Sequence, residues 1–341
     1  MDKGVLGAYI AAAASLIIAL VGLVGSWVAR RSQQRHERTV VELQELHDAR
    51  LKRFEDELGE RRAERDARRE YEFEARKRLY EALEPLLFQM IELAENAWGR
   101  IIGLARTAKA GNLSPGASWL GHESYYYIST MHALMAPVAC ARLLQSRLTL
   151  VDLGVDSSVA GQYAIAKRVY ASFNDDFALA QQAPAISYDP SNRSERRQGI
   201  YAGWLETAAD LLIDVSGAGV YRIRSFGEFD NEYTERKSAI HAHFIKLQYL
   251  FFEFHPRLCP VLWRVLIMQA MLYRALLDGR DAKIAGRPAS TRPVRQVPPD
   301  ARRDFDWRSQ PDEASDEQVF QEPFAAASIR LKAQIPDLCD F

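Results

Sequence analysis

The sequence predicts an all-α protein with an N-terminal single transmembrane helix, a long charged helical stalk and a multi-helix bundle domain. Three observations indicate this order. An uncharged apolar run comes first, a proline-free stretch dense in both charges follows it, and from Tyr71 onward apolar residues recur at helical spacing. Strand patterns are scarce, and VYRIRSF at 220–226 is the one short extended segment that we expect.

The composition fits a protein in a reducing compartment. The 341 residues leave room for one sizeable domain plus accessory segments, and the formal net charge of −1 hides strong local segregation of charge. Cys140, Cys259 and Cys339 are odd in number, far apart and without a CxxC pair. This pattern disfavours a secreted fold held by disulfides.

Residues 5–29 form the predicted transmembrane helix, after a short non-cytoplasmic leader at residues 1–4. The run holds 25 residues without a charge, enough at about 1.5 Å per residue to cross a hydrocarbon core roughly 30 Å thick. Trp27 lies where an interfacial aromatic is expected. The alternatives are a cleaved signal peptide or a buried core helix. A signal peptide has a positive leader and a shorter apolar run, so we favour a retained membrane helix.

The flanking charges predict the orientation of this helix. The leader has one Lys and one Asp, whereas a collar of arginines follows the run: Arg30, Arg31, Arg35 and Arg38. By the positive-inside rule, the N-terminus lies outside and the C-terminal domain is cytoplasmic, at the plasma or inner membrane of the cell. The collar is the predicted membrane-surface anchor, and the lipid bilayer is the first expected partner.

Small residues follow one face of the predicted membrane helix at a spacing of 4,3,4,3,4. They are Ala8, Ala12, Ser15, Ala19, Gly22 and Ser26. Small side chains let two helix backbones approach closely in a bilayer, so this face is a candidate for self-association.

Residues 30–79 read as a charged helical stalk that has no proline and only Gly59 as a glycine. A seam through Val40, Gln44, His47, Leu51, Phe54 and Leu58 predicts a short coiled coil over 40–58. The seam then meets Arg61, Arg65 and Arg68 at positions that should be apolar, and three arginines there would repel and lose hydration. Beyond residue 58 we expect a solvated single helix.

Residues 80–279 form the predicted bundle of five to seven helices, with Pro85 expected to kink the first helix or start a new one. Three apolar stripes predict helices over 159–180, 201–215 and 240–254. Residues 258–277 are apolar on almost every side. That segment is either a buried core helix or a second membrane segment, and Arg264 and Arg274 favour the buried helix.

Residues 280–341 are expected to form a flexible tail rich in proline and charge. Five prolines lie between residues 288 and 311. A short amphipathic helix is predicted near 324–334, which either docks back or meets a partner.

Motifs for catalysis or cofactor binding are absent from the sequence. SGAG at 216–219 lacks the Lys-Ser/Thr of a P-loop and reads as a helix stop. His241 and His243 lie roughly 200° apart on a helix, and prolines interrupt the one that would align His255 with Cys259. We therefore expect no metal site, no cofactor and no catalytic residue, and the distribution of basic residues disfavours nucleic-acid binding.

Three hypotheses of function remain open. The first is a membrane-anchored cytoplasmic scaffold or sensor that acts through a protein partner or as a homo-oligomer. The second is a membrane-acting effector in which residues 258–277 insert when triggered. The third is an enzyme with a dispersed active site between helices, which would use scattered groups such as His132, Asp210 and Glu253. We favour the first, which involves no catalysis.

Overall fold

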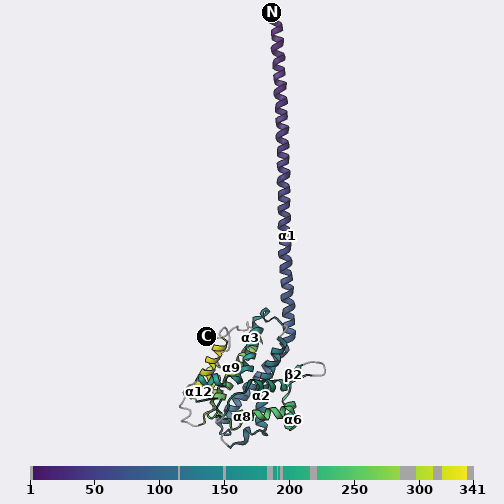
Figure 1. Cartoon of the computed structure of the whole chain (residues 1–341). Coiled ribbons are helices and arrows are strands. Elements are labelled where there is room, and N and C mark those ends of the chain that lie inside the picture. The colour runs from purple at the N-terminus through teal and green to yellow at the C-terminus, as the bar shows by residue number, and fades with distance from the viewer. Residues whose placement is uncertain are drawn as a thin grey trace. The chain divides into compact units, whose positions relative to one another are not determined.

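The computed structural model describes residues 3–113, 116–148, 151–182, 187–189, 191–192, 195–215, 221–284, 297–309 and 317–335. The chain divides into two units, Met1–Phe73 and Glu74–Phe341. The all-α prediction is confirmed, because the described elements are helices apart from two strands of three residues each (Figure 1).

The first unit is the N-terminal part of helix α1 (Lys3–Lys109). Figure 1 shows this part of α1 as one uninterrupted helix. The described side chains from Ala13 to Glu57 are all exposed, including the large apolar ones. The helix in this unit therefore has an apolar surface that no described residue covers.

The second unit begins at Glu74, five residues before the predicted end of the stalk at 79. Leu79 is fully buried, the Arg76 Nε–H donates to the Val155 carbonyl at 3.1 Å, and the Tyr80 hydroxyl donates to Asp156 at 2.6 Å. Pro85 does not end the helix, since α1 continues on both sides of it. The buried face of α1 then runs through Leu83, Met90, Ala94, Ala97 and Ile101.

The other elements of the second unit follow α1 in chain order. They are η1 (Ser118–Leu120), α2 (Tyr125–Arg147), η3 (Leu153–Val155), α3 (Ser157–Ala171), η4 (Ser172–Asn174), α4 (Asp176–Gln181), α5 (Ala202–Leu212), β1 (Ile213–Val215), β2 (Tyr221–Ile223), α6 (Phe226–Thr234), α7 (Ala239–Phe244), η5 (Ile245–Leu247), α8 (Gln248–Phe251), α9 (Pro260–Ile284), α10 (Pro299–Arg302), η6 (Arg303–Phe305) and α12 (Glu317–Gln334).

Helices α2 and α9 form the centre of the domain. Helix α2 packs against α3, α5 and α6, whereas α9 packs against α3, α4 and α12. Pro137 lies inside α2, and the Tyr127 hydroxyl ties this helix to α7 by donating to the Phe244 carbonyl at 3.1 Å. One apolar core joins these elements.

Two of the predicted stripes differ from the helices observed. The helix expected over 159–180 ends at Ala171, because the Ser172 hydroxyl bonds back to the Val169 carbonyl and a 3-10 turn separates α3 from α4. Phe177, an apolar residue of that stripe, is half exposed. In the stripe expected through Tyr201, Trp204, Ala208, Leu211 and Val215, Ala208 is buried, Leu211 is half-buried and the other three are exposed. The remaining buried residues of α5 are Leu205, Ala209 and Leu212.

The stripe over 240–254 is buried throughout although it is not one helix. Ile240, Phe244, Leu247, Phe251 and Phe254 are each at most 1% exposed, and they lie on α7, η5, α8 and the turn that follows. The extended segment expected at 220–226 is strand β2, which pairs antiparallel with β1.

Helix α9 lies in the core of the second unit. It contains residues 260–277 of the apolar segment, and 83% of its most apolar window is buried. Arg264, the largest fully buried side chain, pairs with Glu322 at 2.8 Å and donates to the Leu179 carbonyl at 2.8 Å. The burial of α9 fits the core helix that we favoured over a second membrane segment.

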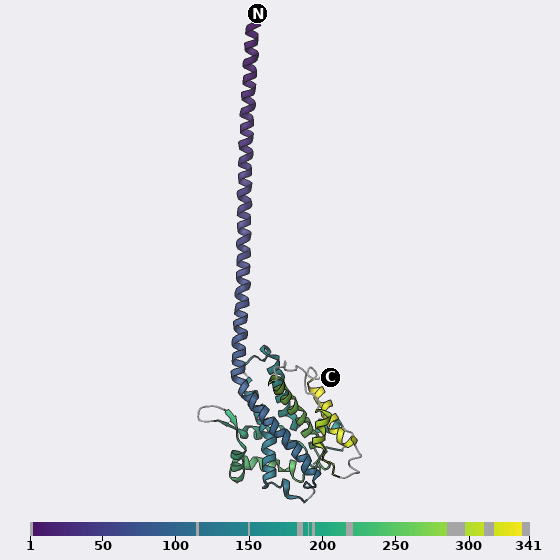
Figure 2. The same cartoon turned by 180° about the vertical axis from the view of Figure 1, so that it is seen from behind.

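The expected flexible tail over 280–341 is wrong for its described residues. Residues 297–309 and 317–335 fold onto the domain, and α12 lies beside α9 (Figure 2). The helix expected near 324–334 starts earlier, at Glu317, and docks back onto the domain. Aromatic residues hold this segment, because Phe305, Trp307, Phe320 and Phe324 are all buried.

Candidate functional site

The N-terminal part of α1 is the first candidate for a functional surface. Two described helices are long and apolar enough to cross a membrane, the N-terminal one and α9. None of the most apolar window of the N-terminal helix is buried, and Ile17, Ile18, Leu20, Val21 and Leu23 are more than half exposed. Apolar surface of this size is unfavourable in water at about 25 cal/mol per Å², which makes this stretch a candidate for an apolar environment.

The predicted collar follows directly on the same helix. Arg30, Arg31, Arg35 and Arg38 lie on α1 within nine residues of one another. The Arg31 guanidinium stacks 4.8 Å from the ring centre of Trp27, which places an aromatic and a cation together at the end of the apolar run. Such a pair suits a membrane interface, where a ring and a charge both find favourable surroundings.

The small-residue face also lies on this uninterrupted helix. Ser15, Ala19, Gly22 and Ser26 are exposed, whereas the side chains of Ala8 and Ala12 lie outside the described residues. A Cβ placed at Gly22 would meet nothing within 4 Å, and the Ser26 hydroxyl bonds back to the Leu23 carbonyl. The face therefore carries only small side chains, and the Ser26 hydroxyl already has a hydrogen-bond acceptor within the helix.

The stalk is likewise helical and exposed. Val40, Leu51 and Phe54 of the predicted seam are between 45% and 59% exposed, while Leu58 is half-buried. Beyond it Arg68 pairs with Glu72 and Arg69 with Asp66 along the same helix. The predicted coiled coil over 40–58 remains a prediction, since it concerns a second helix.

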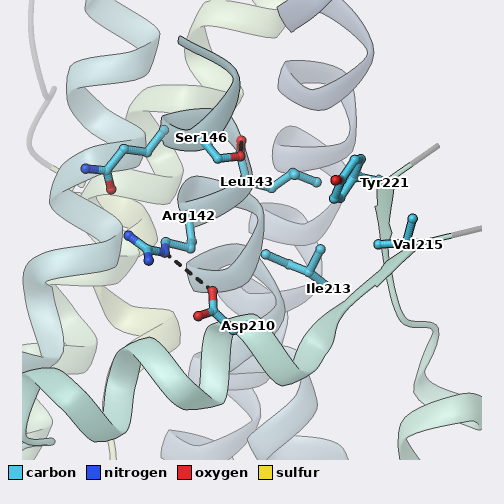
Figure 3. Close-up of a pocket in the computed structure, with 8 residues that line it drawn as sticks. Arg142, Leu143, Ser146, Asp210, Ile213, Val215 and Tyr221 are labelled. Atoms are coloured by element: carbon cyan, nitrogen blue, oxygen red, sulfur yellow. Dashed lines mark hydrogen bonds and ion pairs between the residues drawn. The ribbon is translucent and has the colours of Figure 1, made fainter. Parts of the chain in front are cut away.

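A pocket of the second unit lies between α2, α5 and the strands β1 and β2 (Figure 3). Leu143, Ile213, Val215 and Tyr221 give it apolar walls. Arg142 points toward Asp210, at 3.4 Å, and also pairs with Glu206. Arg142 thus already faces two carboxylates, and a second guanidinium, that of Arg147, lies 4.3 Å from the ring centre of Tyr221.

The three groups named for the enzyme hypothesis have separate partners. The His132 Nε2 bonds the Arg224 carbonyl at 2.9 Å, and burial lowers the pKa of His132. Asp210 pairs with Arg142 in the pocket, while Glu253 lies in a turn at a positive φ of 51°, where its backbone carbonyl accepts from Arg196. These contacts stabilise the fold and bring no nucleophile next to a base.

The other groups with metal-binding or nucleophilic chemistry have structural partners as well. Within the described ranges, no three His, Cys, Asp or Glu residues are grouped as a metal site would require. His241 bonds the Tyr233 carbonyl and His243 the Trp204 carbonyl. Burial raises the pKa of Cys140 to about 12 and also raises that of Cys259, so both thiols stay protonated.

Polar contacts between residues distant in sequence fix the C-terminal segment, and no sequence pattern predicted them. Besides Arg264 with Glu322, Arg330 pairs with Asp175 at 2.6 Å, and Gln334 donates to the same carboxylate. The partners are far apart in sequence, so no local pattern relates them. One signal was present, because an arginine on a helix that is apolar all round requires a buried partner.

Comparison with known proteins finds no protein-family model, no curated protein and no solved structure that matches this chain.

Proposed function

We propose that this protein is a single-pass membrane-anchored scaffold or sensor, with its N-terminus outside and its helical domain in the cytoplasm. One observation carries the proposal. The uncharged run is exposed along its whole described length and ends at a collar of four arginines. A helix of this kind is stable in a bilayer and costly in water, and its basic end favours the cytoplasmic side.

The domain supports a role in binding rather than in chemistry. Arg142 at the pocket is paired with Glu206 and Asp210, the buried His132 bonds the Arg224 carbonyl, and burial keeps the Cys140 thiol protonated. The stalk has an exposed apolar stripe that a protein partner would cover.

The effector hypothesis would require α9 to leave the core. That movement would expose Arg264, separate it from Glu322 and open the contacts of α9 with α12. Placing an arginine in a bilayer costs several kcal/mol, so the buried state of α9 favours the scaffold.

Membrane extraction and tag accessibility test the proposal together. The full chain with a C-terminal tag should stay in the membrane pellet after alkaline carbonate washing. In intact cells the tag should be protected from added protease and become cleavable only after lysis. A soluble chain, or a tag cleaved from outside intact cells, would contradict the proposal.

Replacing the four collar arginines by glutamine tests the orientation separately. The positive-inside rule predicts that a fraction of the chains then inserts the other way, with the tag outside. A matched variant replaces four stalk arginines beyond residue 60 instead, namely Arg61, Arg62, Arg65 and Arg68. These lie farther from the membrane end, so the tag should stay protected.

A further inference from the structure

The small-residue face and the seam of the stalk lie on one side of the same helix. Their spacing continues through Ala29, Gln33 and His36 to Val40 without a break in the helix. From Ala8 to Leu58 there are 50 residues and fourteen steps, or about 3.6 residues per step, which is the repeat of a straight α-helix. A face that starts in the apolar run therefore stays on the same side to the end of the seam.

The phase of this face changes once. Steps of three and four alternate up to Val40, and the next step to Gln44 is again four before the alternation resumes. An extra four residues in a heptad pattern locally unwinds a supercoil rather than ending it. A face with a strict heptad repeat drifts slowly around a straight helix. The one additional step of four corrects this drift and keeps the face on one side of α1.

The arginine collar stays away from this face. At 100° per residue, Arg31 and Arg38 lie about 170° from the midpoint between Gln33 and His36. Arg35 lies about 130° away and Arg30 about 90°. A second helix on the face would thus meet none of the four guanidinium groups head on.

The charges beside the seam fit a second, parallel copy of the chain. In a parallel coiled coil, the residue at position g of one helix faces the residue at position e of the next heptad in its partner, five residues further along. This rule pairs Arg50 with Glu55 and, at the end of the seam, Glu57 with Arg62 across the two copies, and both pairs are of opposite charge. Because the pairs repeat on both sides of the symmetry axis, an in-register pair of identical chains gains each contact twice.

We propose that the chain forms a parallel, in-register homodimer along this face, from the apolar run to Leu58. The parallel direction rests on the proposed membrane anchor, since two chains inserted from one side run the same way. Gln44 and His47 would lie in the seam, where polar residues fix register and oligomer state at some cost in stability. Arg61, Arg65 and Arg68 would end the contact.

Cysteine crosslinking of the full chain in native membranes tests the dimer. Phe54→Cys lies on the seam and Leu46→Cys lies about 130° from it, although the two side chains are equally exposed at 59% and 58%. In the apolar run, Ala19→Cys lies on the face and Ile17→Cys on the opposite side. We expect disulfide-linked dimers of this chain from Phe54→Cys and Ala19→Cys, and little from the two controls or the parent chain.

A charge exchange tests the register. Glu57→Arg should lower the crosslinking yield at Phe54→Cys severalfold, and adding Arg62→Glu should restore it. Equal crosslinking on and off the face, no dimer at any position, or a product with a different protein would overturn the dimer. An unrestored charge exchange would overturn the register.

Carbonate extraction of the same samples separates this inference from the proposed function. A chain that remains in the membrane pellet without crosslinking contradicts the dimer alone. A chain that leaves the pellet contradicts the anchor, and its crosslinking at Phe54→Cys then decides the dimer by itself.

Discussion

The N-terminal part of α1 and helix α9 both have the length and composition of a membrane helix, and their surroundings are opposite. None of the apolar window in α1 is buried, whereas 83% of that in α9 is. Helix α9 also contains Arg264, whose charge is paired with Glu322, while residues 5–29 contain no charge at all. A buried arginine with a protein partner therefore marks a core helix, and an uncharged run whose apolar window is exposed marks the candidate for lipid.

Lysine substitutions in the two helices should have the largest effects, and effects of different kinds. Ile17→Lys with Leu20→Lys should raise the free energy of membrane insertion by about 6 kcal/mol and release the chain into the soluble fraction. Leu266→Lys in α9 should instead unfold the domain and leave the anchor in the membrane.

The control for this pair is Leu46→Lys with Ala49→Lys, in the exposed stalk away from the seam. It should change neither the membrane fraction nor the melting of the domain. If the double lysine at Ile17 and Leu20 left the chain in the membrane, or if Leu266→Lys released it, the contrast between the two helices would be lost.

Breaking the buried ion pair should have the next largest effect. Glu322→Gln leaves the Arg264 guanidinium without a counter-charge in the core and should lower the free energy of unfolding by about 3–5 kcal/mol. Chemical denaturation followed by tryptophan fluorescence in mild detergent measures it. Arg274→Gln is the matched control, because this arginine is one-third exposed and should cost less than about 1 kcal/mol. An equal loss of unfolding free energy in the two variants would mean that burial does not determine how much an ion pair stabilises the domain.

The start of α9 provides a smaller effect. The Gln198 side-chain oxygen accepts hydrogen bonds from the Val261 and Leu262 backbone N–H groups at 2.9 and 3.2 Å. Gln198→Ala leaves these buried donors unpaired and should cost about 1–3 kcal/mol in the same denaturation experiment. Gln181→Ala, at an exposed position of α4, should cost almost nothing. An equal cost at both positions would exclude the capping role.

The pH dependence of His132 should be the smallest effect. Burial lowers its pKa in the folded state below the ordinary value of about 6.5. Between those two values the unfolded chain binds more protons, so stability is full above pH 6.5 and falls as the pH drops through the folded pKa. His132→Gln keeps a donor for the Arg224 carbonyl and should flatten this dependence. His243 is present in both the parent chain and the His132→Gln variant, so it contributes equally to their pH dependence. If the stability of the two proteins changed in parallel between pH 7.5 and 5.5, the role of His132 would be contradicted.

The sequence predicted the helical class because local spacing reports on helix faces. The stripe from Ile240 to Phe254 is buried at all five positions even though the backbone changes from an α-helix to a 3-10 turn within it. Burial patterns thus survive small changes of helix type. The ends of the helices were not predicted correctly, because the end of α3 involves a hydroxyl contact at Ser172 that the spacing of apolar residues does not reveal.

The C-terminal segment shows what sequence reasoning could not reach. Prolines and mixed charges between residues 288 and 311 indicated a flexible tail, yet Phe305 and Trp307 are buried. The partners that fold this segment, Glu322 with Arg264 and Arg330 with Asp175, are more than fifty residues apart. Contacts at that separation leave no period in the sequence, and none of them was predicted.

Photocrosslinking from the two helices tests the central claim most directly. A diazirine amino acid placed at Leu20 of α1, or at Leu266 of α9, is activated in intact membranes from cells that express the full chain. We predict crosslinks to lipid acyl chains from position 20 and crosslinks within the protein from position 266. Crosslinks from position 20 to protein alone, or to no lipid, would contradict the assignment of the N-terminal helix to the bilayer.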